Sequence, residues 1–148
     1  SAYHLSIDLK DAESGPAVIS TLREAAPGMV SRTWLCHHEV ERLAMLRQLD
    51  PDIRLVNSTR MDRLEHSPER RAALLSELGI DGINLFHTEW NGGLTTLFHR
   101  FGRTAFGWGI EYERQFENAY RMGLDAVYSD WVDRMIDCYR AELGRPTV

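Results

Sequence analysis

Short apolar segments alternate with amphipathic segments along the whole chain. The apolar segments lack a strict alternation of apolar and polar residues, which is typical of parallel strands that are covered on both faces. They predict six strands, at Leu5–Leu9, Arg32–Leu35, Ile53–Val56, Gly82–Phe86, Thr104–Trp108 and Ala126–Ser129. The chain therefore consists of strand-then-helix units in one unbroken series.

The amphipathic segments between these strands have the spacing of helices. Apolar residues at the i, i+3, i+4 and i+7 positions of one helical face occur at Leu94, Leu97, Phe98 and Phe101, and similar stripes begin at Val40, Phe116 and Val132. Ser67 and Pro68 are typical of a helix start. Gly79, Gly102 and Gly123 each follow a helical stripe, where a left-handed residue ends a helix.

Two architectures fit this series. A (β/α)8 barrel needs eight units and typically about 250 residues, so six units in 148 residues predict an incomplete α/β TIM barrel in a single domain, residues 1–148. A doubly wound sheet also accommodates six units, but no Gly-x-Gly-x-x-Gly or P-loop follows any strand. The pattern alone leaves both open.

Composition narrows the function classes. The chain is 43% hydrophobic and 26% charged, with a net charge of −5 and charges of both signs interspersed. No arginine run or basic patch argues for nucleic acid. No segment approaches the roughly 20 apolar residues of a transmembrane helix. Cys36 and Cys138 are too few for a disulfide framework, so a reduced, cytoplasmic chain is expected.

In both architectures, chemistry collects at the carboxyl ends of the strands. The polar and aromatic residues expected there are Asp8, Lys10, Cys36, His37, His38, Asn57, Ser58, Thr59, Asn84, His87, Trp108, Ser129 and Asp130. Spacing alone does not assign roles within this set.

Three segments carry a resemblance to a known family. His4–Lys10 (HLSIDLK) resembles the "nIEIK" strand of glycerophosphodiester phosphodiesterases. Thr104–Ile110 (TAFGWGI) resembles the strand with the "WTVN" motif, and Leu124–Asp133 (LDAVYSDWVD) resembles the closing "GvDgIiTDyPd" segment. The motifs occur in the family's order over nearly the whole chain. The family fold is a TIM barrel, of which this chain corresponds to strands three through eight.

The resemblance implies metal-dependent hydrolysis of glycerophosphodiesters, substrates of lipid metabolism, to glycerol 3-phosphate and an alcohol. Asp8 stands where the family has a metal-binding glutamate, and a hard cation such as Mg²⁺ or Ca²⁺ accepts oxygen ligands. Lys10 matches the lysine near the phosphate, where it stabilises developing charge. Trp108 matches a tryptophan that walls the substrate pocket, and Gly109 follows where threonine is usual.

Other family motifs have no counterpart. The "HRG", "E-x-D" and "HD" segments supply both catalytic histidines and two metal carboxylates, and neither His-Arg-Gly nor His-Asp occurs in this sequence. We therefore expect this chain alone to lack the chemistry and to bind the cation incompletely. We also expect it to pair with a missing N-terminal barrel portion, with a copy of itself or with another protein.

Several alternatives stay open. Asp8 and Lys10 lie two residues apart on one strand face, and could form a structural ion pair. The segment Cys36–Glu39 could bind a transition metal, but adjacent histidines on a strand diverge. His87 is expected in a loop near the mouth, where it could contact substrate. The chain is either part of a hydrolase or a non-catalytic barrel fragment that acts as a binding or interaction module.

Overall fold

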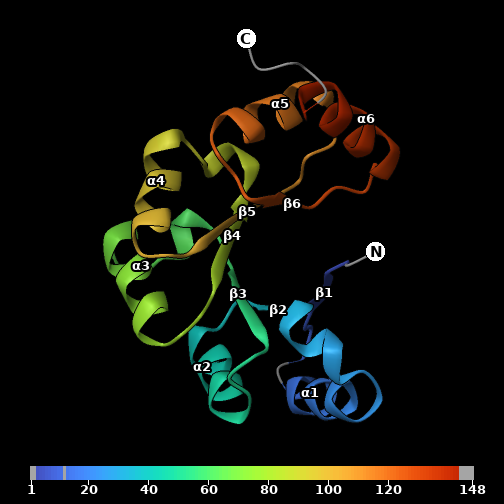
Figure 1. Cartoon of the computed structure of the whole chain (residues 1–148). Coiled ribbons are helices and arrows are strands. Elements are labelled where there is room, and N and C mark those ends of the chain that lie inside the picture. Colours follow the sequence, from blue (N-terminus) through green and yellow to red (C-terminus); the bar gives the residue numbers. More distant parts are fainter. Residues whose placement is uncertain (1–2, 12, 144–148) are drawn as a thin grey trace.

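The computed structural model describes residues 3–11 and 13–143. Its six strands form one sheet in which every pair is parallel and the order follows the sequence. The strands are β1 (Leu5–Asp8), β2 (Thr33–His37), β3 (Arg54–Ser58), β4 (Gly82–Phe86), β5 (Thr104–Trp108) and β6 (Ala126–Val127). The sheet curls into an arc (Figure 1), so the barrel alternative is confirmed and the doubly wound order is excluded.

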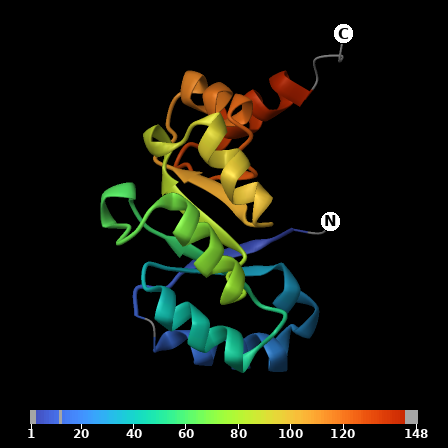
Figure 2. The same cartoon turned by 90° about the vertical axis from the view of Figure 1, so that its left-hand side faces the viewer.

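Helices lie on the convex side of this arc (Figure 1). They are α1 (Ser14–Ala25), α2 (Val40–Leu49), α3 (Pro68–Glu77), α4 (Gly92–Arg100), α5 (Glu113–Arg121) and α6 (Val132–Leu143). Figure 2 shows α3 and α4 side by side across the outside of the sheet. Short 3-10 helices cover Pro27–Arg32, Met61–Arg63 and His87–Glu89.

Alternate residues of each strand enter two separate apolar layers. Outward-facing side chains such as Leu35, Leu55 and Ile83 are completely buried against the helices and form the main core. Inward-facing Cys36, Val56 and Phe106 form a smaller cluster on the concave side, with Trp34, Ala126 and Tyr128 packed against it. The near-continuous apolar runs in the sequence have this cause, because both faces of the sheet are covered.

The helix ends follow the sequence signals. Ser67 Oγ accepts a hydrogen bond from Arg70 N at the start of α3. Gly79, Gly102 and Gly123 have φ angles of 67°, 66° and 82°, which are favourable for glycine because it has no Cβ. The left-handed helix ends predicted at these glycines are confirmed.

Two similar segments, Leu78–Ile83 (LGIDGI) and Met122–Val127 (MGLDAV), form the same helix-to-strand turn. In both, an aspartate just before the strand accepts a hydrogen bond from the backbone N–H of the preceding strand. Asp81 Oδ2 accepts from Leu55 N at 2.8 Å, and Asp125 Oδ2 accepts from Ala105 N at 2.7 Å. The repeated sequence thus fixes how one strand begins beside the next.

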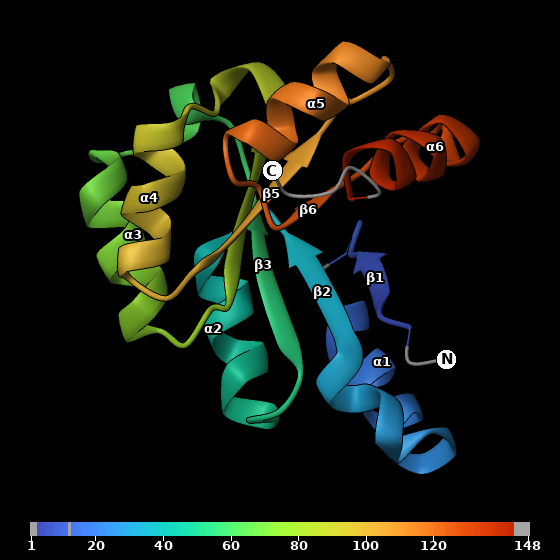
Figure 3. The same cartoon turned by 45° about the horizontal axis from the view of Figure 1, so that its top comes forward.

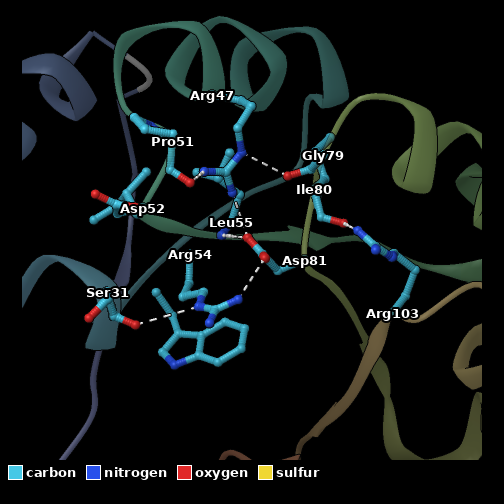
Figure 4. A network of polar contacts seen from close by, with 12 residues as sticks. Ser31, Arg47, Pro51, Asp52, Arg54, Leu55, Gly79, Ile80, Asp81 and Arg103 are labelled. Carbon is cyan, nitrogen blue, oxygen red and sulfur yellow. Dashed lines mark hydrogen bonds and ion pairs between the residues drawn. The ribbon is translucent and has the colours of Figure 1, made fainter.

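Asp81 also holds two arginines at the amino ends of the strands (Figure 4). Its carboxylate pairs with Arg47 Nη2 at 2.7 Å and with Arg54 Nη1 at 3.1 Å. Arg47 in turn donates to backbone carbonyls, including that of Gly79 at 2.8 Å. This end of a barrel serves stability rather than catalysis.

The arc is open between its first and last strands. Within the described residues, β1 pairs only with β2, and β6 pairs only with β5 (Figure 3). Side-chain contacts cross the concave side, because the Tyr128 hydroxyl lies 2.8 Å from Ser6 Oγ on β1 and 3.5 Å from Cys36 Sγ on β2. The molecule is therefore a curled half-barrel, as predicted from six units.

Candidate functional site

Asp8 and Lys10 form an ion pair at the carboxyl end of β1. Both side chains are exposed, 56% for Asp8 and 87% for Lys10. The hydrogen bond to the Asp8 carboxylate, and then its charge, raise the pKa of Lys10. The two residues thus form an ion pair, but the pair is exposed rather than a structural pair that fills the barrel interior, so a ligand can reach it.

Lys10 is the only lysine among the 17 lysine and arginine residues of the sequence. Lysine carries a compact point charge on a flexible stem, whereas arginine carries a planar fork. All the other residues of this group are arginines, so the only side-chain ammonium group of the sequence stands at the end of β1. This position suits a mobile charge that turns from one partner to another.

Trp108 ends β5 and is half-buried. Its ring meets the edge of Phe86 at 4.8 Å between centroids. Gly109, which follows it, has a φ of 77°, and a Cβ there would lie 2.3 Å from Phe86 Cε2. Phe86 therefore explains why glycine stands at this position, since any larger residue would displace the ring.

The strand register assigns Asp8, Ser58 and Trp108 to one layer of an ideal barrel, at the carboxyl ends of the strands. The register connects Asp8 on β1, strand by strand, to Thr104 on β5. The intermediate partners are Cys36, Val56 and Gly82. An eight-stranded barrel of shear eight is staggered by about one residue per strand. From β1 to β5 there are four strand steps, so the residue in the layer of Asp8 lies four positions beyond Thr104, at Trp108. From β1 to β3 there are two steps, so the residue in this layer lies two positions beyond Val56, at Ser58.

Arg60 adds a second cation to this mouth, and the sequence analysis did not identify it. Its guanidinium lies 5.0 Å from the Phe86 ring centroid and 5.7 Å from that of Trp108. Glu89 pairs with it at 3.0 Å and also accepts from the backbone N–H of Phe86 at 3.2 Å. The ion pair and the two rings hold Arg60 in place over the aromatic wall.

Asn84 lies just below this layer and is 6% exposed. Its Nδ2 donates to Ser58 Oγ at 3.1 Å. Among the described residues, no group pairs with its Oδ1. A buried carbonyl without a partner is costly, so this oxygen is available to a water or to a ligand hydroxyl.

His87 does not share the concave face. It follows inward-facing Phe86 and packs beside that ring, with centroids 4.6 Å apart. Its side chain lines a cavity of about 420 Å³ that also includes Gln115, Asn118 and Arg121 of α5. Burial lowers the pKa of His87. Contact with a substrate at the mouth stays a prediction, which this placement does not favour.

A complete metal site is not present in residues 3–11 and 13–143, where no group of three His, Cys, Asp or Glu residues is arranged to hold an ion. Mg²⁺ takes six ligands and Ca²⁺ six to eight, whereas Asp8 offers one carboxylate. In the segment Cys36–Glu39, His37 Nδ1 accepts from Glu39 N at 3.0 Å, and the His37 and His38 rings stack at 4.4 Å. The residues present therefore do not fit a divalent cation by themselves.

Cys36 is no nucleophile in this setting. Its thiol lies 3.5 Å from both Ser6 Oγ and the Tyr128 hydroxyl in the concave cluster. Burial raises the pKa values of both Cys36 and Tyr128. A protonated, buried thiol is unreactive, so Cys36 has a packing role.

Comparisons with solved structures identify the same fold. The chain is similar to a protein named as a glycerophosphoryl diester phosphodiesterase from Silicibacter pomeroyi, with a TM-score of 0.80, 18% identity, and coverage of 95% of this chain and 51% of that chain. It is similar to an Oleispira antarctica phosphodiesterase in complex with the product sn-glycerol-3-phosphate, with a TM-score of 0.75, 18% identity, and coverage of 92% and 55%. A mandelate racemase/muconate lactonizing protein from Herpetosiphon aurantiacus also matches, at TM-score 0.60 and 15% identity over 95% and 44% of the two chains.

These likenesses show the fold. No protein-family model matches the sequence. No curated protein sequence matches it either. The chain spans about half the length of the solved structures that it matches. A barrel fold hosts many unrelated activities, so the function must be argued from the mouth.

Proposed function

We propose that this chain supplies the phosphate-binding and aromatic side of a glycerophosphodiester phosphodiesterase site. The observation that carries the proposal is the layer at the mouth, where Asp8 with Lys10 and Trp108 with Arg60 occupy the carboxyl ends of β1 and β5. The matched fold of glycerophosphoryl diester phosphodiesterases supports it.

In this proposal the two cations divide the anionic substrate between them. Lys10 leaves Asp8 to balance charge on the phosphoryl oxygens, and Arg60 provides a fixed fork beside them. Trp108 and Phe86 form an apolar wall for the carbon atoms of the substrate. The free Asn84 carbonyl oxygen is an acceptor for a hydroxyl group.

Asp8 would contribute one carboxylate to a divalent cation, Mg²⁺ or Ca²⁺, in this hydrolysis. A bound cation would polarise the phosphoryl oxygen. In this proposal the remaining ligands and the acid and base come from outside this chain, so its own residues bind and orient the substrate. Its two buried, unpaired cysteines are compatible with a reduced, cytoplasmic location.

A second candidate function is a non-catalytic module that binds phosphate esters. The Asp8–Lys10 ion pair favours it, because Lys10 already neutralises the carboxylate that a cation would otherwise bind. Both candidates require a ligand at the mouth, and they differ in turnover when the missing carboxylates and histidines are supplied.

The single lysine permits a direct test. Reductive methylation with ¹³C-formaldehyde labels Lys10 and the terminal amine while keeping the charge of each. We expect the Lys10 methyl signal to shift saturably when glycerol 3-phosphate is added, and Trp108→Ala to weaken binding. Tyr120→Ala is the control, because Tyr120 is 51% exposed near the end of α5, on the side of the barrel where the strands begin.

Turnover is tested separately. The purified chain with Mg²⁺ or Ca²⁺ should not hydrolyse glycerophosphocholine, because general acid–base catalysis typically contributes about 10²–10⁴-fold. Robust turnover by the chain alone would show that the catalytic set lies within it. A Lys10 signal that ignores glycerol 3-phosphate would refute the proposed site.

A further inference from the structure

A second cavity lies on the rim of the barrel, between the segments that follow β2 and β3. It has a volume of about 280 Å³. Its walls come from the start of α2, from the chain that connects β3 to α3, and from the first turns of α3. The mouth residues Asp8, Trp108 and Arg60 do not line it.

Five of the eight ionisable side chains that line this cavity are basic. The basic residues are Arg63, Arg70, Arg71, His38 and His66. Among the described residues, none of the three arginines is in an ion pair, and only Arg71 donates a side-chain hydrogen bond, to Asn57 Oδ1 at 3.3 Å. Elsewhere in the protein, Arg23, Arg47, Arg54 and Arg60 each pair with a carboxylate.

The guanidinium groups of Arg63 and Arg70 donate to no group among the described residues, so their N–H donors are available to an anion in the cavity. Guanidinium groups bind phosphate oxygens through paired hydrogen bonds, which are the strong kind. The start of α3 does not provide this anion site by its backbone, because Pro68 has no N–H and Arg70 N donates to Ser67 Oγ. The arginine side chains are therefore the available donors.

Carboxylates also line the cavity and limit its ligand. Glu39 is held by Arg42 at 3.3 Å and lies 3.8 Å from His38. Glu41 and Glu65 are exposed members of the lining. With the two histidines counted as neutral, three arginines and three glutamates give the lining a formal charge of zero, which favours one small phosphate group over a polyanion.

We propose that this rim cavity binds a phosphate group, either as the free ion or as the end of a phosphomonoester, through Arg63, Arg70 and Arg71. The site is independent of the function proposed for the mouth. The two sites lie at the same end of the barrel. Asp8 and Cys36 are register partners on β1 and β2, and Lys10 and His38 respectively follow them by two residues.

Isothermal titration of the chain with inorganic phosphate, at constant ionic strength with chloride as the reference, tests this. We expect saturable binding that Arg63→Gln/Arg70→Gln weakens by at least about tenfold, because a hydrogen bond to a charged group contributes about one such factor or more. Arg140→Gln is the matched control, since Arg140 is exposed on α6 and lines no part of this cavity. Both arginines of the double variant are exposed, and unchanged thermal melting would verify its fold.

Lys10→Gln separates the two sites. Loss of phosphate binding in Lys10→Gln, with full binding in Arg63→Gln/Arg70→Gln, would assign the ion to the mouth and overturn the rim site. Absence of saturable binding would overturn it as well. Titration of Lys10→Gln with glycerol 3-phosphate identifies the source, because tighter binding than that of phosphate in this variant indicates a phosphomonoester and equal binding indicates the free ion.

Discussion

Replacing Asp81 by alanine should destabilise the protein more than any other single aspartate discussed above. The side chain is 19% exposed and accepts three hydrogen bonds. Its removal leaves Leu55 N–H, on a fully buried residue, without an acceptor and leaves Arg47 without its carboxylate. Both losses lie at the amino end of β3 and β4, where the strands begin.

The magnitude follows from the partners that remain. An orphaned buried N–H costs about 1–3 kcal/mol. Arg47 still donates to the carbonyl oxygens of Gly79, Asp50 and Pro51, so its loss is about 1 kcal/mol rather than the full cost of an isolated buried charge. Arg54 is 47% exposed and adds little. We expect the substitution to lower the free energy of unfolding by about 3 kcal/mol in total, which lowers the melting temperature by roughly 10 °C.

Urea unfolding at low protein concentration, followed by tryptophan fluorescence, measures this change. Asp81→Asn should cost about half as much, because its amide oxygen can still accept from Leu55 N. Asp62→Ala is the control, since Asp62 is exposed, and it should change stability by less than about 0.5 kcal/mol. A cost below about 1 kcal/mol for Asp81→Ala would refute the argument that this carboxylate fixes the strand.

Three further predictions test other parts of the molecule. Gly109→Ala should lower the free energy of unfolding in urea by about 1–3 kcal/mol, because Gly109 has a φ of 77° and a Cβ there would contact Phe86. Gly92→Ala should leave this free energy nearly unchanged, because a Cβ there would meet nothing within 4 Å. Burial opposes ionisation of Asp50, but the hydrogen bonds from Arg23 and from two backbone N–H groups outweigh it and lower the pKa of Asp50. This stabilisation is present above the ordinary aspartate pKa and is lost as pH falls through the lower folded value. The advantage of wild type over Asp50→Asn should therefore shrink as pH falls below the ordinary aspartate pKa, and an advantage that grows on acidification would contradict it. The unpaired edges of β1 and β6 should make the chain associate at micromolar concentration, and light scattering that finds a cooperatively melting monomer would show that the arc is stable alone.

Much of the fold could be predicted from the apolar pattern. The bounds predicted for β4 and β5 agree with the structure. β2 begins one residue later than expected, since Arg32 belongs to the preceding 3-10 helix, and it extends to His37, which is buried although polar. β6 is shorter than expected and ends at Val127, consistent with a strand that has a neighbour on one side only. Apolar runs locate strands well, but hydrogen bonding to neighbours decides where they end.

The candidate sites show where sequence reasoning stops. Asp8 and Trp108 could be named because a family motif surrounds each of them. Arg60 could not, because its position over two rings depends on how β3 lies beside β4. The rim cavity draws Arg63, His66 and other residues from three separate segments, and no short motif records their convergence.

The Asp8–Lys10 ion pair makes cation binding and anion binding at the mouth depend on each other. A cation that binds Asp8 must displace the Lys10 ammonium, and an anion that binds Lys10 must leave Asp8 without its counter-charge. Each event therefore removes the competitor of the other, and thermodynamic linkage requires the two to strengthen each other by the same factor. The empty mouth is thereby electrically neutral at this pair, and a cation and a phosphate that bind there would each strengthen the binding of the other.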